Sequence, residues 1–311
     1  ASIPAQNRVV ALPDRNNDGI ADQVVDIVKD LRNPHGIAFF NGKLFIAEET
    51  SIKRYLWDES DLVATFDKEL FNLPQGGNHV TRSIIFDKKG ALYVSIGSSC
   101  NVCFESDDRR AAIMVSDADG NSPQVYAKGL RNTVFMAGHP QTGELWGADM
   151  GRDYLGDFTP PDEINVIKSN RDYGWPLCYG GKIHDTVFDN NQYIVDPCAK
   201  TEPAQFGFDA HTAPLGLKFI ESQQFPLDWQ NDLLVSLHGS WNRTSPIGYK
   251  IVHLKLSGND VVSQSDFLWG FLNRDQKVVG RPVDVEFDSE GSLFISDDKN
   301  GMIYKVIAEK N

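Results

Sequence analysis

Residues 84–95 read IIFDKKGALYVS, and this stretch decides the fold. Two runs of β-branched and aromatic residues flank a Lys-Gly turn, where glycine accepts the positive φ of a tight hairpin. The stretch therefore predicts strand, turn and strand. The same pattern recurs at 37–47, 136–147, 217–236 and 285–296, and internal similarity of this kind indicates a repeat architecture.

A further strand is predicted after most of these hairpins, at 52–56, 112–115, 163–167, 249–254 and 302–306. These runs mix polar and apolar residues, as outer strands of a small antiparallel sheet do. Repeated four-stranded units of roughly 40 to 50 residues are typical of a β-propeller. Five units are clear, and a sixth can be built from 8–12 and 21–28. We predict an all-β fold, a six-bladed β-propeller of four-stranded antiparallel blades.

The repeats run through the chain, so we expect a single propeller domain over 1–311. Residues 1–32 form an N-terminal segment that carries a candidate calcium loop. Residues 175–210 are rich in Gly, Pro, Asn and Asp and contain a cysteine pair, which predicts a long stapled loop between blades.

The charge balance excludes several partners. With 30 Lys and Arg against 43 Asp and Glu, the formal net charge is -13, and nucleic acids and anionic membrane surfaces both require a basic footprint. No window approaches the ~18 uncharged apolar residues of a spanning helix, so we expect no membrane insertion. Nothing in the sequence identifies a dimer seam, and we expect a monomer.

The four cysteines are Cys100, Cys103, Cys178 and Cys198. The chain begins ASIPA, without Met or a basic leader, which suits a chain whose export signal has been removed and equally a trimmed one. For an exported protein the simplest pairing is Cys100 with Cys103 and Cys178 with Cys198, although three connectivities are possible. A four-cysteine zinc site and a redox dithiol are the alternatives. We predict a periplasmic or secreted protein.

Polar side chains gather at one end of the predicted blades. In a propeller, the start of each first strand and the end of each second strand converge on one face of the channel. The residues at these positions include several His and Arg, which imply an anionic ligand. Those before first strands are His35, His79, Arg82, Arg131, Asn132, His211, Thr212 and Arg281. Those after second strands are Glu48, Ser98, Asp149, Arg152, Trp241 and Arg243.

Five motifs here resemble the soluble glucose/sorbosone dehydrogenases, which are pyrroloquinoline quinone (PQQ) enzymes. They are NHVTR at 78–82, GLRN at 129–132, the run 149–165, DYGWP at 172–176 and LHGSWNR at 237–243. The resemblance extends from about residue 33 to 306. The segments 98–103 and 238–243 place the chain nearer the sorbosone and aldose branch. The family fold is a six-bladed propeller, in agreement with the repeats.

The resemblance implies a set of catalytic roles. His79 is the general base that takes the hydroxyl proton from C1 of the sugar while hydride passes to C5 of the quinone. Arg131 and Asn132 lie against the quinone oxygens, where positive charge stabilises the anion formed on reduction. Gly151 and Arg152 supply backbone carbonyls to a Ca²⁺ that also binds PQQ and acts as a Lewis acid.

The remaining cofactor contacts follow from the carboxylates of PQQ. Arg243 and Arg281 are the expected clamps, with Thr212 as a hydroxyl donor and His35 and Trp241 as further contacts. The resemblance thus implies a PQQ- and Ca²⁺-dependent dehydrogenase that oxidises an aldose to its lactone and passes electrons to a diffusible or protein acceptor. Both Arg131 and Trp241 also have a purely structural interpretation. Arg131 could form an ion pair between blades, and Trp241 could fill a gap between blades.

A separate motif, DRNNDGIAD at 14–22, is similar to the first part of an EF-hand loop. Its oxygen ligands would be the side chains of Asp14, Asn16, Asp18 and Asp22 with the carbonyl of Ile20. Position 12 of the loop is a valine, so the bidentate Glu is missing. A plain Asx-turn, in which the side chains cap the backbone, is the alternative to calcium binding.

Two other functions compete with the dehydrogenase. Six-bladed propellers with a channel calcium also hydrolyse lactones, and such a protein would hold its metal by side chains deep in the channel. A non-catalytic propeller would bind a protein or glycan on the same face, without a quinone and without a calcium requirement.

Overall fold

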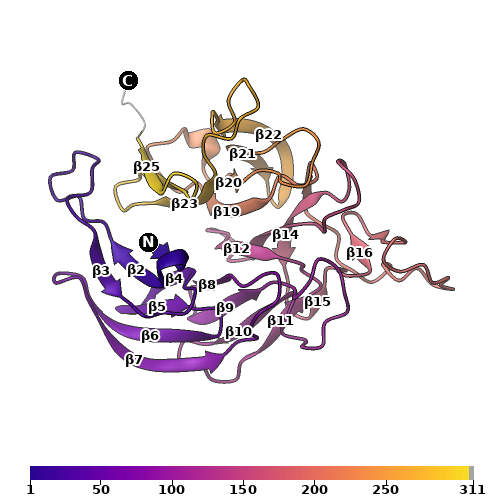
Figure 1. Cartoon of the computed structure of the whole chain (residues 1–311), viewed down its shortest axis with the longest axis horizontal. Helices are drawn as coiled ribbons and strands as arrows, with labels where there is room; N and C mark the ends of the chain where they lie inside the picture. Colours follow the sequence, from indigo (N-terminus) through magenta and orange to yellow (C-terminus); the bar gives the residue numbers. More distant parts are fainter. Residues whose placement is uncertain (308–311) are drawn as a thin grey trace. The chain divides into compact units, whose positions relative to one another are not determined.

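The computed structural model describes residues 1–307 and contains two compact units, Ala1–Lys128 and Gly129–Asn311. Strands dominate both units, and the only helical elements described are two short 3₁₀ turns, η1 (Pro4–Gln6) and η2 (Leu227–Trp229). Six small antiparallel sheets are the blades of a six-bladed β-propeller (Figure 1), which confirms the predicted fold class. No helix in the described part of the chain is long and apolar enough to cross a membrane.

Three sheets lie in the first unit, and their strands follow chain order. The first has three strands, β1 (Ser2–Ile3), β2 (Arg8–Ala11) and β3 (Val25–Val28). The second has β4 (Gly36–Phe40), β5 (Lys43–Ala47), β6 (Ser51–Asp58) and β7 (Val63–Asn72). The third has β8 (Arg82–Phe86), β9 (Ala91–Ile96), β10 (Ala112–Asp117) and β11 (Gln124–Lys128).

Three of the six blades also lie in the second unit, apart from a small two-stranded sheet described below. The first has β12 (Thr133–Gly138), β13 (Leu145–Asp149), β14 (Asp162–Ile167) and β18 (Phe206–Phe208). The second has β19 (Pro214–Phe219), β20 (Leu233–Leu237), β21 (Lys250–Ser257) and β22 (Asp260–Leu268). The third has β23 (Pro282–Phe287), β24 (Leu293–Asp297) and β25 (Met302–Val306).

All five predicted hairpins are present, as β4–β5, β8–β9, β12–β13, β19–β20 and β23–β24. The sixth sheet contains both N-terminal segments assigned to it, as β2 and β3. Two features differ from the prediction. The sheets β1–β3 and β23–β25 have three strands in place of four.

The long stapled segment is the second difference. Because β18 pairs with β14, residues between them are an insertion within one sheet and not a loop between blades. The insertion contains the short strand β15 (Arg171–Asp172) and a small hairpin, β16 (Cys178–Tyr179) with β17 (Ile183–His184), which extends away from β14 in Figure 1.

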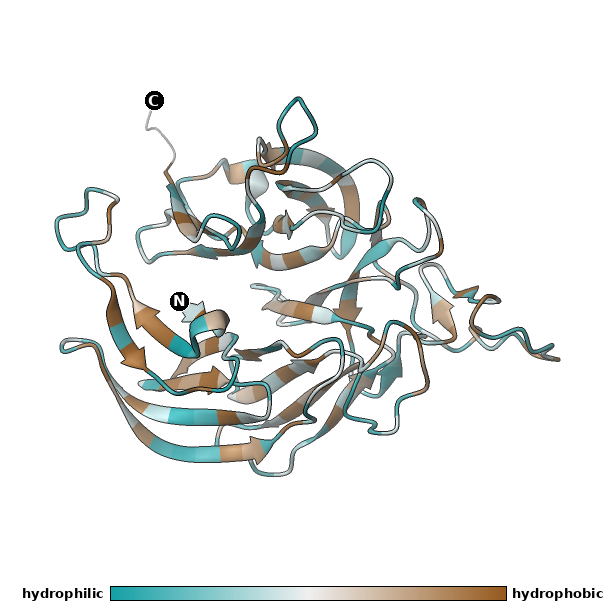
Figure 2. Ribbon diagram, viewed as in Figure 1, coloured by the Kyte–Doolittle hydropathy of each residue, from teal (hydrophilic) through white to brown (hydrophobic). Residues whose placement is uncertain are grey.

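Inner strands such as β5 and β20 are buried on both faces, and alternate residues along each strand belong to different hydrophobic clusters. In the first unit Phe45, Leu92 and Val94 are buried in one cluster, and in the second unit Trp146 and Val235 are buried in another. Figure 2 shows the resulting alternation of hydrophobic and hydrophilic residues along β6 and β7. Burial of these side chains stabilises each sheet pair by the transfer of apolar surface from water.

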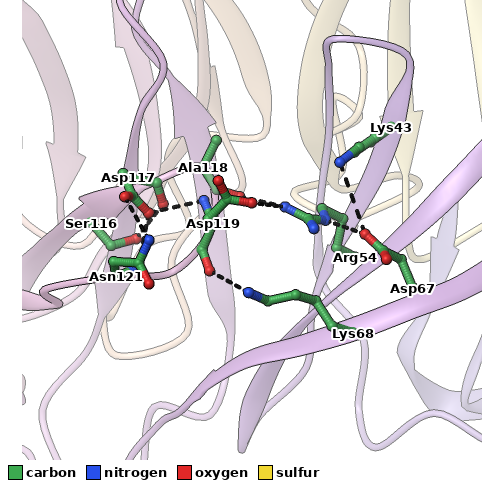
Figure 3. A network of polar contacts seen from close by, with 9 residues as sticks. All are labelled: Lys43, Arg54, Asp67, Lys68, Ser116, Asp117, Ala118, Asp119 and Asn121. Atoms are coloured by element: carbon green, nitrogen blue, oxygen red, sulfur yellow. Dashed lines mark hydrogen bonds and ion pairs between the residues drawn. The ribbon is translucent and has the colours of Figure 1, made fainter.

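A polar network joins the sheet β4–β7 to the sheet β8–β11 within the first unit (Figure 3). The buried guanidinium of Arg54 on β6 donates to Asp67 at 2.5 Å, to Asp119 at 2.6 Å and to the carbonyl of Ala118 at 3.1 Å. Lys68 donates to the carbonyl of Asp119 at 2.8 Å. Arg54 therefore fixes the turn between β10 and β11 to the outer strands of its own sheet.

We expect Arg54→Met to lower the free energy of unfolding by about 2 kcal/mol, because it removes a buried charged donor that binds three acceptors. The exposed partners reduce the effect below that of a fully buried pair. Urea denaturation checks this through the midpoint. Lys68→Met in the same network is the control and should cost about 0.5 kcal/mol or less; equal losses for the two variants would contradict the assignment.

Candidate functional site

One arrangement recurs at the ends of three hairpins. A carboxylate that ends the second strand accepts the backbone N–H of an arginine that precedes the first strand. Asp149 accepts from Arg131 at 3.1 Å, and Asp297 accepts from Arg281 at 3.0 Å. The first unit has the same contact between Glu48 and Arg32. The repeat itself thus places an arginine at the same point of each of these sheets.

His79 lies in the first unit, in the loop before β8, with its ring against Ser98 at the end of β9. Its Nδ1 is 3.0 Å from the carbonyl oxygen of Ser98 and 2.9 Å from the Ser98 hydroxyl. That hydroxyl donates its proton to the carbonyl of Cys100 at 2.6 Å. Both oxygens facing Nδ1 are therefore acceptors, so Nδ1 carries the proton and the neutral ring has its lone pair on Nε2. A general base needs that tautomer.

Arg82 holds the loop that carries His79. Its fully buried guanidinium donates to the carbonyls of Pro74 at 2.7 Å, Thr81 at 2.8 Å and His79 at 3.0 Å. Burial lowers the pKa of Arg82 to about 10, so the side chain is still charged at neutral pH. This arginine is an organiser of the loop, a role that the sequence did not reveal.

We expect Ser98→Ala to loosen the tautomer of His79, because it removes one of two acceptors from Nδ1 while the backbone carbonyl remains. Two-bond ¹H–¹⁵N NMR spectra report which ring nitrogen carries the proton. The wild type should be in the Nδ1–H form, and the variant should populate the Nε2–H form as well. Ser99→Ala, whose hydroxyl contacts Glu105 instead, is the control and should leave the ring unchanged.

His35 is a second predicted contact, in the loop before β4. Its Nδ1 is 3.1 Å from the hydroxyl of Ser83. Burial lowers the pKa of His35 to about 4, so the imidazole is neutral at pH 7. It can supply a hydrogen bond to a ligand but no charge for an anion.

In the second unit the structure brings Arg131 and Gly151 together. The buried guanidinium of Arg131 donates to the Gly151 carbonyl at 2.8 Å and to Asp153 at 3.2 Å. Burial lowers the pKa of Arg131, while Asp153 and Asp149 oppose that effect. Because a carbonyl oxygen has two lone pairs, the Gly151 oxygen retains one that can coordinate a cation.

The segment around Gly151 is closely packed. A Cβ at this position would lie 2.7 Å from the Cγ of Pro160 and 2.9 Å from the carbonyl oxygen of Pro161, so only glycine fits. The side chain of Arg152 points to Asp185 at 2.8 Å, within the insertion. The side chain of Asn132 lies 3.9 Å from the sulfur of Met150.

Asp162 fixes the other side of this segment. It accepts the backbone N–H groups of Gly151 at 2.9 Å and Ala213 at 2.8 Å. The hydroxyl of Thr212 lies 3.2 Å from both Asp162 and the carbonyl oxygen of Asp209. Both oxygens are acceptors, so the hydroxyl proton of Thr212 is used within the protein. The sequence had predicted that Thr212 would donate this proton to the cofactor. Burial raises the pKa of Asp162 to about 6.

Glu163 is a buried carboxyl next to Asp149 across the strand pair. Burial first, and then the nearby Asp149, raise the pKa of Glu163 to about 8, so the group is mainly protonated at neutral pH. Glu163 accepts the N–H of Gly180 at 2.6 Å and lies 3.1 Å from the side-chain amide of Asn165. If that amide is turned over, its oxygen accepts the carboxyl proton.

Four buried N–H groups of the second unit have no hydrogen-bond partner among the described residues. One of them, Nε1 of Trp146, lies within the hydrophobic core, and the other three are Nε1 of Trp175, Nδ2 of Asn242 and Nε of Arg281. Nor does Arg243 or Arg281 have a carboxylate within 4 Å in residues 1–307. Buried donors without acceptors suit a ligand rich in oxygen and negative charge. This donor set fits the carboxylates and carbonyls of PQQ.

Arg243 and Trp241 lie in the loop after β20. Arg243 donates to the carbonyl of Ala210 at 3.0 Å and its guanidinium carbon lies 5.1 Å from the centre of the Phe158 ring. Trp241 is 64% exposed and meets Tyr154 edge to face. Trp241, which the sequence predicted as a cofactor contact, is therefore an exposed side chain in the loop after β20.

The side chains of the loop at 14–22 cap its own backbone. Asp14 accepts the backbone N–H groups of Asp18 at 3.1 Å and Gly19 at 2.9 Å, and Asp18 accepts that of Ile20 at 2.8 Å. Asp22 accepts the N–H of Arg15 at 2.9 Å. These are Asx-type contacts. Calcium binding by this loop stays a prediction.

Both predicted disulfides are present, Cys100–Cys103 and Cys178–Cys198, and they fix one of the three possible connectivities. They also exclude the zinc and dithiol alternatives for the oxidised protein. Within residues 1–307, the one cluster of three possible metal-binding side chains combines Cys100 and Cys103 with Glu105, and both of its sulfurs are oxidised.

The chain is similar to a described protein family and to several sugar dehydrogenases. The model of a family described as TrAA12-like matches residues 7–309. An uncharacterized protein of Borreliella burgdorferi is 33% identical, over 93% of this chain and 79% of that protein. The aldose sugar dehydrogenase YliI of Escherichia coli is 25% identical, over 81% of this chain and 66% of that enzyme.

A PQQ-dependent pyranose dehydrogenase of Coprinopsis cinerea is 33% identical, over 89% of this chain but only 46% of the fungal protein. The chain therefore spans less than half of that relative. The holo PQQ domain of a pyranose dehydrogenase from the same fungus superposes with a TM-score of 0.81 at 20% identity, over 96% of this chain and 92% of the domain. At this identity the structural likeness shows the fold, and the family resemblance found in the sequence motifs is confirmed by the family match.

Proposed function

Because the chain belongs to the TrAA12-like family, whose characterised relatives above are sugar dehydrogenases, we propose that it is a PQQ- and calcium-dependent dehydrogenase that oxidises an aldose at C1 to its lactone. The observation that carries the proposal is the set of buried N–H groups without acceptors, on Trp175, Asn242 and Arg281. In the family motifs two of these residues fall within DYGWP and LHGSWNR.

In this proposal His79 is the general base. Its Nε2 takes the proton of the C1 hydroxyl, while Nδ1 remains bonded to Ser98, so the ring receives the proton without turning. Arg82 supports the step by holding the carbonyl of His79 in place. PQQ, when bound, supplies the acceptor for the hydride that leaves C1.

The cofactor site would be built around the segment that Asp162 and Arg131 hold. The carbonyls of Gly151 and Arg152 would bind the calcium, and the lone pair remaining on the Gly151 oxygen supports that role. Arg131 and Asn132 would lie against the quinone oxygens. The positive charge of Arg131 stabilises negative charge that develops there in a buried setting.

The other contacts form an outer part of the proposed site. Arg243 and Arg281 would bind the carboxylates of PQQ, and neither has a competing carboxylate within ion-pair distance in the described residues. Trp241 would contact the bound molecules from the rim. His35 would serve as a neutral hydrogen-bonding group, and Thr212 would contribute only as an acceptor.

We further propose that the protein acts as a monomer in an oxidising compartment, the periplasm or the exterior, and passes electrons to a diffusible or protein acceptor. Disulfide bonds persist in such compartments, and both pairs of cysteines are bonded.

A titration of metal-stripped protein with PQQ tests the proposal, in the presence and absence of Ca²⁺, followed by glucose or another aldose. We expect binding only with calcium, and bleaching of the oxidised quinone spectrum on addition of sugar. Failure of PQQ to bind at micromolar concentration with calcium present would show that the cofactor assignment is wrong. Lactone hydrolysis would then be the activity to assay.

A further inference from the structure

Three large aromatic side chains are exposed close together in the second unit. Tyr154 and Phe158 follow β13, and Trp241 follows β20; they are 67%, 82% and 64% exposed, respectively. The rings of Tyr154 and Trp241 meet edge to face, with centroids 5.8 Å apart. We call Tyr154, Phe158 and Trp241 the aromatic platform. Exposed aromatic side chains that gather in one patch are a candidate binding surface, because contiguous apolar patches often mark interaction sites.

The platform is built on anchored loops. The carbonyl of Gly156 is 2.8 Å from Nε2 of His211, and Asp157 accepts the backbone N–H of Thr244 at 3.0 Å. Arg243 lies over the Phe158 ring and donates to the carbonyl of Ala210. These contacts join the two loops that carry the aromatic side chains. The rings are therefore held in place and do not simply occupy loose surface.

The backbone of Tyr154 shows the same constraint. Its φ is 69°, in the left-handed region that a bulky aromatic residue adopts at a cost of about 1 to 3 kcal/mol. Arg131 stabilises this segment, since it binds the Gly151 carbonyl and the Asp153 carboxylate just before Tyr154. The platform thus begins three residues from Gly151, in the proposed cofactor segment, and is continuous with it along the chain.

We propose that the aromatic platform binds the pyranose units of a saccharide chain whose reducing end enters the proposed site. This inference rests on the proposed function and names its substrate class: an oligosaccharide or polysaccharide end. Pyranose rings present a flat apolar face of C–H groups that stacks on an aromatic ring, with hydroxyl groups around the rim. Asp157 is a polar neighbour of the platform, and its carboxylate can accept hydrogen bonds from those hydroxyl groups.

A protein partner fits the same surface less well. Stable protein interfaces bury about 800 Å² on each partner, and three side chains supply a small part of that area. The surface combines the three rings with the polar side chain of Asp157, which suits a hydroxylated ligand better than an apolar protein face does.

The test measures binding in the absence of PQQ. The probes are maltotetraose, cellotetraose and xylotetraose, each reduced with borohydride so that no oxidisable end remains. We expect calorimetry to show binding of at least one of these probes to the full chain, and binding of glucitol to be at least tenfold weaker. Trp241→Ala and Phe158→Ala should each weaken the bound probe about tenfold or more, which corresponds to about 1.4 kcal/mol.

Trp269→Ala is the matched control, because Trp269 is 69% exposed in the same unit but lies after β22. It should leave binding unchanged. The proposal is overturned if none of the probes binds at roughly 10 mM, or if Trp241→Ala and Phe158→Ala bind as the wild type does. Each side chain is exposed, so an unchanged urea midpoint will establish that the variants are folded. Since no PQQ is present, the result is independent of the cofactor titration.

Discussion

His79→Ala is expected to reduce sugar oxidation by about 10²- to 10⁴-fold while PQQ binding stays within twofold of the wild type. The range is what a positioned general base contributes to a proton transfer. In the proposed mechanism His79, whose ring is held by Ser98, acts on the hydroxyl of the sugar and not on the cofactor, so its removal should spare binding. The measurement is the single-turnover rate of quinone bleaching with saturating aldose, together with a PQQ titration of the same variant.

His184→Ala provides the control. His184 pairs with Asp189 in the insertion, and its loss should leave the single-turnover rate near that of the wild type. A rate for His79→Ala within tenfold of the wild type would show that another group removes the proton. Loss of PQQ binding in His79→Ala would instead show that His79 is a cofactor contact and not the base.

Glu163→Gln is expected to change the pH dependence of stability. The pKa of Glu163 is raised from 4.5 to about 8 in the folded chain, mainly by burial. Between these values the folded state keeps a proton that the unfolded state releases, so stability falls as pH rises, by about 1.4 kcal/mol per pH unit. Glutamine resembles the protonated acid, since it is neutral, has nearly the same shape and keeps an oxygen that can accept from Gly180. The variant should lack this fall.

The measurement is the free energy of urea unfolding of apo protein at pH 5, 6, 7 and 8. The difference between Glu163→Gln and wild type should grow steadily over this range and favour the variant. Asp149 and Asp162, whose pKa values are raised to about 6, titrate mainly while Glu163 is still protonated, so their contributions to the two proteins are similar. The exposed Glu221→Gln is the control and should follow the wild type. Parallel curves for Glu163→Gln and wild type would mean that Glu163 is charged in the folded state.

The hairpins were predictable because each is encoded locally. In the stretch 84–95, a glycine turn and two strand-forming runs specify β8 and β9 without reference to the rest of the chain. The outer strand β18 was not predictable in the same way. It has only three residues, Phe206–Phe208, and its partner β14 ends far earlier in the sequence, so no periodic pattern links them.

The candidate site was likewise predictable where it depends on local sequence, and not predictable where it depends on tertiary contacts. The positions of His79, Arg131 and Gly151 at strand ends follow from the repeat and from the motifs. Their partners do not, because a hydrogen bond such as that from His79 to Ser98 depends on how two strand ends meet. For Thr212 the sequence predicted a hydroxyl group that donates to the cofactor, whereas in the structure this hydroxyl contacts Asp162.

The aromatic platform was also outside what the sequence could show. Tyr154 and Phe158 resemble any aromatic residues in a loop, and hydrophobic residues are more often buried than exposed. Only the folded loops show that they are exposed and share a surface with Trp241. Tyr154 and Phe158 are visible in the sequence as two aromatic residues shortly after β13. Nothing in the sequence shows that they lie near Trp241, which follows β20.

The insertion between β14 and β18 has a consequence for biosynthesis. Until β18 arrives, the backbone groups along one edge of β14 are unpaired, and such an edge can associate with other chains. The bond between Cys178 and Cys198, which are 20 residues apart, roughly halves the path from Ile167 to Phe206 and lowers the cost of closing it by about 0.6 kcal/mol. Expression in a reducing compartment should therefore lose newly made chains to aggregation at this edge, whereas an oxidising compartment should rescue the yield.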